Sequence, residues 1–168
     1  MKNYKLPVLG LALILIIVSC RKEDIQKTNT ESQSISSSGS IQTAKWISIN
    51  NWSFSTTENV ATYFSKMSDT LIANEVAKSG LVLVYMKTGN EIQSLPFEEK
   101  DTKTSWYYQV SKGSIRINSD NNDGQKLNRH SFSYLIITPQ QLYTLEASGK
   151  TKLDLMQLSY EQAASVLN

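Results

Sequence analysis

Nucleophilic catalysis in this chain would depend on one residue, because His130 is the only histidine among the 168 residues. A Ser-His-Asp triad needs a histidine as general base, and a serine held in a strained turn is often marked by Gly-x-Ser-x-Gly. That pattern does not occur in the sequence. We therefore assign no catalytic residue and expect His130 to be a solvated side chain at the start of a strand.

Acidic residues could serve a glycosidase or a metal site. Glu98, Glu99 and Asp101 lie in one charged segment, but nothing pairs any of them with the second carboxylate, about 5–9.5 Å away, that glycoside hydrolysis needs. The Asn- and Asp-rich segment 118–124 suggests calcium, yet Asp123 stands where an EF-hand loop needs glycine. We expect a hairpin turn there, with adventitious calcium as the alternative, and predict no metal site and no cofactor.

Aromatic side chains offer the one pattern that suggests a ligand. In a strand over Trp106–Val110, alternation places Trp106 and Tyr108 on one face and Tyr107 on the other. Exposed aromatic faces bind sugars by stacking, although tryptophan more often fills a core. Trp46, Trp52 and Tyr107 are the candidate ligand platform.

The N-terminus has the zones of a signal peptide. Lys2 and Lys5 precede an apolar run over residues 7–18, which is shorter than the roughly 20 residues that a membrane-spanning helix needs. The run ends in Ile17-Val18-Ser19-Cys20, and no other cysteine occurs in the chain. The alternatives are an ordinary secretory signal with a chance cysteine and an uncleaved tail.

This ending resembles the lipobox of bacterial lipoproteins. The resemblance implies that residues 1–19 are removed as a signal peptide and that Cys20 becomes a lipidated N-terminus, with membrane lipid as its partner. Each buried CH₂ contributes about 0.8 kcal/mol, so two or more acyl chains hold a protein stably.

The residues after Cys20 resemble the surface-export signal of Bacteroidota lipoproteins. Lys22, Glu23 and Asp24 are the matching positions. The resemblance implies an outer-membrane protein that faces the cell exterior. The alternative is a solvated charge run at the start of a linker.

Composition limits the partners of the mature chain. Removal of Lys2 and Lys5 lowers the Lys and Arg total from 17 to 15, equal to the 15 Asp and Glu. A neutral chain without a basic cluster argues against nucleic-acid binding. Segment 28–43 holds nine Ser or Thr among sixteen residues, so we expect a flexible lipidated tether over 20–43 and a single β-rich domain over 44–168.

Hydrophobic periodicity predicts mainly strands in that domain. The expected strands are 46–49, 52–54, 60–64, 81–86, 91–97, 106–110, 115–117, 132–138 and a last one at 153–155. Leu81–Met86 is apolar at every position, which indicates a central strand covered on both faces.

Three short helices are expected. Their segments are 68–78, closed by Gly80; 139–145, opened by Thr138-Pro139; and a C-terminal helix after the capping box Ser159–Gln162. The fold class is therefore mostly β, or α+β, with an antiparallel, sandwich-like domain and two or three short helices.

The element pattern resembles small Bacteroidota lipoproteins that have no assigned activity. The matching features are Trp46 or Trp52, Gly80–Tyr85, Leu95-Pro96-Phe97 and Tyr160–Ala164. The resemblance implies the architecture only.

These observations favour an outer-membrane-anchored lipoprotein that presents a non-enzymatic binding or scaffolding domain. A glycan or an envelope protein is the expected partner. The alternatives are a hydrolase of surface polymers, which needs a concave pocket with convergent acids or His130, and a structural accessory of the envelope. A binding module should instead present a flat aromatic or apolar patch.

Overall fold

The computed structural model describes residues 42–57, 60–120, 124 and 127–166. These residues belong to the second of two compact units, which begins at Ser37. The predicted signal peptide, Cys20 and the Lys22–Asp24 segment lie outside the described residues. Within the described ranges, none of the helices combines the length and the apolar character needed to cross a membrane.

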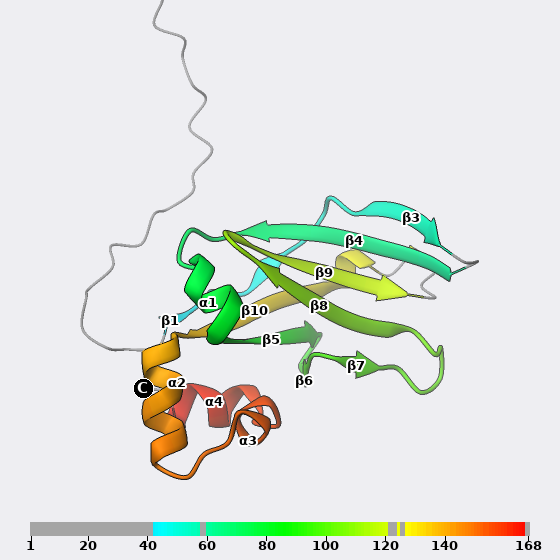
Figure 1. The fold of residues 1–168 in the computed structure, drawn as a ribbon. Helices are drawn as coiled ribbons and strands as arrows, with labels where there is room; N and C mark the ends of the chain where they lie inside the picture. The colour runs from blue at the N-terminus through cyan, green and yellow to red at the C-terminus, as the bar shows by residue number, and fades with distance from the viewer. Residues whose placement is uncertain (1–41, 58–59, 121–123, 125–126, 167–168) are drawn as a thin grey trace, which may run out of the picture. The chain divides into compact units, whose positions relative to one another are not determined.

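Two antiparallel sheets face each other (Figure 1). We name them sheet A and sheet B. The strands of sheet A are β1 (Gln42–Thr43), β2 (Ile47–Ser48), β5 (Leu81–Thr88), β6 (Glu91–Ser94) and β10 (His130–Ile137). The strands of sheet B are β3 (Ser53–Thr57), β4 (Val60–Ser68), β7 (Phe97–Glu98), β8 (Ser105–Ser111) and β9 (Ser114–Asp120). The predicted mostly-β, sandwich-like fold is confirmed.

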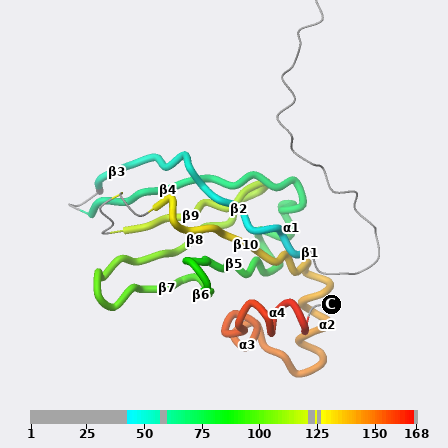
Figure 2. Tube along the Cα trace, turned by 180° about the vertical axis from the view of Figure 1, so that it is seen from behind, coloured from blue at the N-terminus to red at the C-terminus, as the bar shows by residue number. Residues whose placement is uncertain are grey.

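Three of the four α-helices cover the face of sheet A that points away from sheet B (Figures 1 and 2). The helices are α1 (Asn74–Ser79), α2 (Pro139–Ala147), α3 (Lys152–Met156) and α4 (Tyr160–Val166), with a 3-10 turn, η1, at Leu127–Arg129. The predicted C-terminal helix is α4, and the described residues form four α-helices where two or three were expected.

Strand β5 is central and is covered on both faces, as its continuous apolar run predicts. It lies between β10 and β6, and its first six residues are buried. Its residues facing sheet B are Val82, Val84 and Met86, and those facing the helices are Leu81, Leu83 and Tyr85. One strand therefore contributes to two separate cores.

Sheet B has an outer face, which is turned away from sheet A. Its order is β3-β4-β9-β8-β7, and β8 and β9 form a hairpin joined by Lys112 and Gly113. Gly113 has φ +74°, a conformation that glycine adopts without steric cost. The chain passes from β6 in sheet A to β7 in sheet B through a cis Leu95–Pro96 peptide.

The predicted start of the first helix was wrong. Ser68 is the last residue of β4, and α1 begins only at Asn74. The Asp69 carboxylate does not cap a helix, because its Oδ1 accepts a hydrogen bond from the backbone N–H of Leu71 and its Oδ2 accepts one from the hydroxyl of Tyr134. A local turn and a long-range contact thus replace the first helical turn.

The predicted strand at 153–155 was also wrong, because these residues form helix α3. Thr151 and Asp154 make a reciprocal capping box: Thr151 Oγ1 accepts from the backbone N–H of Asp154, and the Asp154 carboxylate accepts from that of Thr151. The capping box thus provides hydrogen-bond acceptors for two backbone N–H groups at the start of the helix. These hydrogen bonds favour a helix over a strand.

The folded domain begins before the predicted boundary at residue 44. Gln42 and Thr43, which were assigned to the tether, pair with Ile136 and Leu135 at the edge of sheet A. Backbone pairing with β10 therefore places at least these two residues in the domain.

Leu155→Ala and Leu153→Ala form a matched pair that tests the α3 assignment. In a strand, residues i and i+2 share a face. In helix α3, by contrast, the Leu153 side chain is 64% exposed and the Leu155 side chain is 1% exposed. We expect Leu155→Ala to lower the free energy of unfolding by about 2–5 kcal/mol and Leu153→Ala to change it by less than about 0.5 kcal/mol, measured by urea denaturation. Equal losses for the two variants would contradict the helix.

Candidate functional site

Strand alternation divides sheet B into a core face and an outer face. On β8, Trp106 is fully buried and Tyr108 packs against the inter-sheet core, so Tyr107 points outward as predicted. On β9, Ile115 and Ile117 are fully buried, and the residues between and beyond them point outward.

Three outward residues form one row across the central strands of sheet B. Phe64 on β4 lies directly opposite Asn118 on β9, and Asn118 lies directly opposite Tyr107 on β8. Directly opposed residues on neighbouring strands have Cβ atoms about 4.5–5.5 Å apart. We call Phe64, Asn118 and Tyr107 the aromatic row.

Asn118 is buried although it belongs to the outer face. It is 2% exposed, and its Nδ2 makes a long contact of 3.5 Å to the carbonyl oxygen of Arg116. A buried amide normally has several strong hydrogen bonds, since it offers two donors and an acceptor. The centre of the row is therefore a polar group with aromatic residues on both sides.

A carboxylate fixes the Tyr107 hydroxyl. Asp120 Oδ1 accepts a hydrogen bond of 2.6 Å from Thr62 Oγ1 and one of 3.3 Å from Tyr107 Oη. Burial, followed by the negative charge of Asp120, raises the pKa of Tyr107 above its ordinary value of about 10. The phenol therefore stays protonated at neutral pH and keeps donating to Asp120, which orients the ring.

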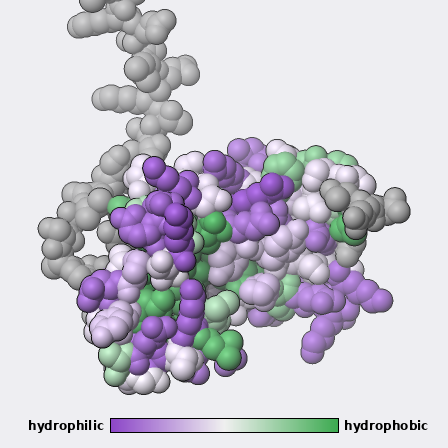
Figure 3. Space-filling model, in the orientation of Figure 1, coloured by the Kyte–Doolittle hydropathy of each residue, from purple (hydrophilic) through white to green (hydrophobic). Residues whose placement is uncertain are grey.

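A cation packs beside the row. The guanidinium carbon of Arg116 lies 3.8 Å from the centre of the Phe64 ring, a close cation–π contact. Its Nε is buried and has no hydrogen-bond partner in the described structure. Lys66, directly opposite Arg116 on β4, is exposed. In the space-filling view, hydrophilic side chains lie along β4 and β9 (Figure 3).

The other two residues of the predicted platform lie elsewhere. The Trp52 ring centre is 6.0 Å from that of Trp106 and 6.1 Å from that of Phe132, so it packs on the inter-sheet core, and its Nε1 donates to the carbonyl oxygen of Ile49. Trp46 packs against Tyr160 of helix α4, with ring centres 5.0 Å apart. Trp46, Trp52 and Tyr107 are therefore not brought together, and only Tyr107 lies on an outer sheet face.

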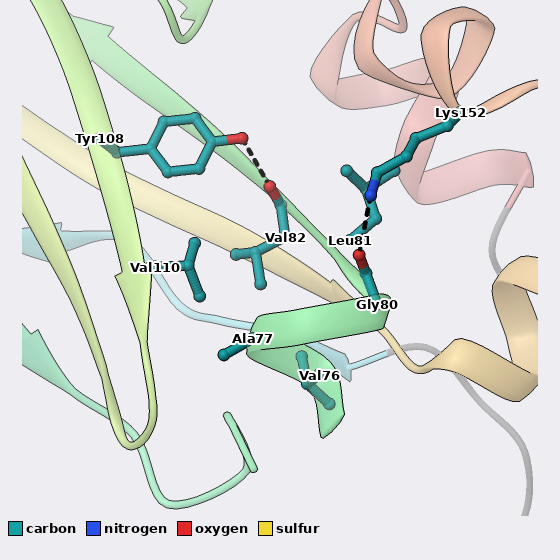
Figure 4. A pocket seen from close by; sticks show the side chains of 8 residues that line it. All are labelled: Val76, Ala77, Gly80, Leu81, Val82, Tyr108, Val110 and Lys152. Atoms are coloured by element: carbon teal, nitrogen blue, oxygen red, sulfur yellow. Dashed lines mark hydrogen bonds between the residues drawn. The ribbon is translucent and has the colours of Figure 1, made fainter. Parts of the chain in front are cut away.

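A shallow pocket of about 160 Å³ opens where α1 meets the two sheets (Figure 4). Its lining is Val76, Ala77, Gly80, Leu81, Val82, Tyr108, Val110 and Lys152. Lys152 Nζ donates to the carbonyl oxygen of Gly80 at 3.2 Å, and the Tyr108 hydroxyl donates to that of Val82 at 2.7 Å. Sites for small molecules measure about 300–1,000 Å³, so this pocket has room for a side chain or a few waters.

The expectation of a solvated His130 was wrong. His130 is 6% exposed, its Nδ1 lies 2.7 Å from Thr88 Oγ1, and its ring centre lies 4.7 Å from that of Trp106. It does begin a strand, β10, as predicted. The imidazole occupies the end of the inter-sheet core and lies outside the lining of the shallow pocket.

One of the carboxylates considered for glycoside hydrolysis, Glu99, has structural contacts. Glu99 Oε1 accepts from Trp106 Nε1 at 3.2 Å, and its Oε2 accepts from Thr102 Oγ1 at 2.9 Å. Over the residues that the structure describes, no three His, Cys, Asp or Glu side chains are grouped as a metal site would require.

Sequence reasoning missed Phe64, Asn118 and Arg116 as surface groups. Asn118 was assigned to a turn over 118–124, but β9 continues through Asp120; residues 121–123 lie outside the described part. The alternation of Arg116 and Asn118 with the apolar Ile115 and Ile117 could have predicted that Arg116 and Asn118 belong to the outer face. The pairing of Phe64 with Asn118 depends on strand register, which a single sequence does not contain.

Comparisons with protein-family models, with curated proteins and with solved structures give no match. The geometry of the domain is therefore the basis for assigning a function.

Stability should depend on the protonation of His130. Burial lowers the pKa of His130 below its ordinary value of about 6.5, so the unfolded chain binds a proton more readily than the folded chain. The free energy of unfolding should fall as the pH drops below about 6.5 and level off once the pH is below the folded-state pKa.

Urea denaturation at pH 7.5, 6.5 and 5.5 measures this effect. Because His130 is the only histidine, the variant His130→Gln should lose the pH dependence in this interval while carboxylates titrate lower. An unchanged slope in the variant would show that other groups cause it.

Proposed function

We propose that this protein is a lipid-anchored binding module that presents the outer face of sheet B to a glycan. The observation that carries the proposal is the aromatic row, Phe64–Asn118–Tyr107, because it places two aromatic residues on the outer face of sheet B, on either side of the buried Asn118. Aromatic rings can stack on the apolar faces of sugar rings.

The rigidity of the row supports this proposal. Tyr107 is held by Asp120, and Phe64 is covered on one side by Arg116. Groups that are already ordered lose little conformational entropy when a ligand binds, so more of the contact energy appears as affinity. The outer face also suits a polymer chain, which can extend across several strands.

The alternatives make different demands on the molecule. A hydrolase of surface polymers would need an acid and a base facing one substrate bond. A scaffolding module would use the same sheet face for an envelope protein and would be indifferent to sugars. A structural accessory would bind neither.

Tyr107→Ala and Tyr143→Ala test the glycan site as a matched pair. Tyr143 is 69% exposed on helix α2, far in sequence from the row, and its loss controls for removal of a surface tyrosine. On a glycan array followed by titration calorimetry, we expect Tyr107→Ala and Phe64→Ala to weaken binding about 5- to 100-fold, on the scale of one aromatic stacking contact, and Tyr143→Ala to have no effect.

An array on which the full-length protein binds no glycan would overturn the proposal. Release of glycan fragments by the protein would instead establish the hydrolase alternative. Capture of an envelope protein from crosslinked membranes, lost in Tyr107→Ala and Phe64→Ala, would establish scaffolding by the same face.

The proposed anchor is Cys20, on the lipobox-like ending Ile17-Val18-Ser19-Cys20. Metabolic labelling with a palmitate analogue should mark the wild-type protein, and Cys20→Ala should lose the label and leave the membrane fraction, because two or more acyl chains are needed for stable attachment. Equal labelling of Cys20→Ala would rule the anchor out.

The proposed outward orientation rests on Lys22, Glu23 and Asp24. Protease treatment of intact cells should remove the domain from the wild-type protein, and the triple alanine variant should be protected. A wild-type protein that resists the protease until the cells are opened would place it on the inner leaflet.

A further inference from the structure

We propose that the glycan bound by the aromatic row is anionic, and that Arg116 and Lys66 bind its carboxylate or sulfate group. This inference rests on the proposed function, and it adds the chemical class of the ligand. It derives from charges on the outer face of sheet B rather than from the aromatic residues.

Arg116 and Lys66 are placed against each other by the sheet. They are directly opposed on β9 and β4, in the outward row next to the aromatic row. Like charges at directly opposed positions destabilise a strand pair. An anion that binds between them would relieve this repulsion.

The Arg116 side chain stacks on Phe64, and among the described residues it has no acidic partner. Its guanidinium lies over the Phe64 ring, and its buried Nε lacks a hydrogen-bond partner in the described part of the chain. Unpaired buried donors are rare in proteins because each one costs free energy. An anion from solvent cannot reach this buried atom, so a carboxylate or sulfate would bind the two terminal nitrogens of the guanidinium in a bidentate geometry.

The aromatic row has an acid on one side and a cation on the other along β9. Asp120 lies two residues beyond Asn118 on β9, whereas Arg116 lies two residues before it. At about 3.4 Å per residue in an antiparallel strand, Asp120 and Arg116 are about 14 Å apart along β9. The face therefore has a positive end and a negative end, and an anionic substituent of a glycan that binds at the aromatic row is directed to the positive one.

The ligand class follows from combining the two rows. The aromatic row can take a sugar ring, and the adjoining cationic pair can take an acid attached to that ring. Uronate and sulfated polysaccharides share this chemistry. Neutral polysaccharides would leave the cationic pair unused.

Two pairs of probes test the inference on the full-length protein in detergent. Polygalacturonate is compared with its methyl ester, and dextran sulfate is compared with dextran, so that each pair differs in charge on the same sugar backbone. We expect at least one anionic probe to bind about tenfold or more tightly than its neutral counterpart, and this difference to shrink as NaCl is raised.

Charge variants locate the contact. Arg116→Gln and Lys66→Gln should each lose most of the preference for the anionic probe, while the controls Arg129→Gln and Lys78→Gln, both exposed elsewhere, should keep it. Arg116→Lys should recover only part of the preference, because an ammonium lacks the planar fork. Lys66→Gln changes an exposed side chain, so its result is informative even if an Arg116 variant unfolds.

The outcomes separate this inference from the proposed function. If neutral and anionic probes bind equally and Tyr107→Ala weakens both, glycan binding stands and the anionic preference is wrong. If an anionic preference persists in Lys66→Gln and Arg116→Gln, the cationic pair is not its source and the inference is overturned. Failure to bind any of the anionic probes overturns it as well.

Discussion

The pairing of β5 with β10 is the constraint on which the rest of the domain depends. Eight consecutive pairs, from Leu81↔Ile137 to Thr88↔His130, join these strands at the centre of sheet A. Both strands carry large apolar side chains on both faces, so water must be excluded from each side. Sheet B excludes it from one side and helices α2, α3 and α4 from the other.

Sheet B follows a different rule, because among the described residues the other sheet packs on its inner face and the helices do not pack on its outer face. Its inner face supplies Trp106, Ile115 and Ile117 to the core. Its outer face is free to carry polar and aromatic groups without loss of core packing. Sheet A packs against the rest of the domain on both faces, whereas sheet B does so on its inner face. This difference explains why the candidate site lies on sheet B.

The parts of the fold that local chemistry determines could be predicted from the sequence. The apolar run Leu81–Met86 indicated a central strand, and Thr138-Pro139 and Ser159–Gln162 marked the starts of α2 and α4. Helix α3 was mistaken for a strand because Leu153 and Leu155 alternate, and five residues are too few for helical periodicity to show.

The candidate site could be predicted only in part. Alternation alone placed Tyr107 outward, since the neighbouring Trp106 had to fill the core. The positions of Trp46 and Trp52 depended on which core lay beside them, and the pairing of Phe64 with Asn118 depended on the register between strands distant in sequence. The local residue pattern of one sequence does not show which strands pair or in which register.

The short strand β1 has a mechanical consequence. The chain that precedes Gln42 enters the domain through β1, whose ladder to β10 consists of the pairs Gln42↔Ile136 and Thr43↔Leu135. Tension transmitted along that chain therefore acts first on a two-residue ladder, which can peel away one pair at a time. The strands β4, β9 and β8 have no ladder to β1 and belong to the other sheet. A pull on Gln42 would thus release β1 from β10 first, while the strands of sheet B keep their pairing.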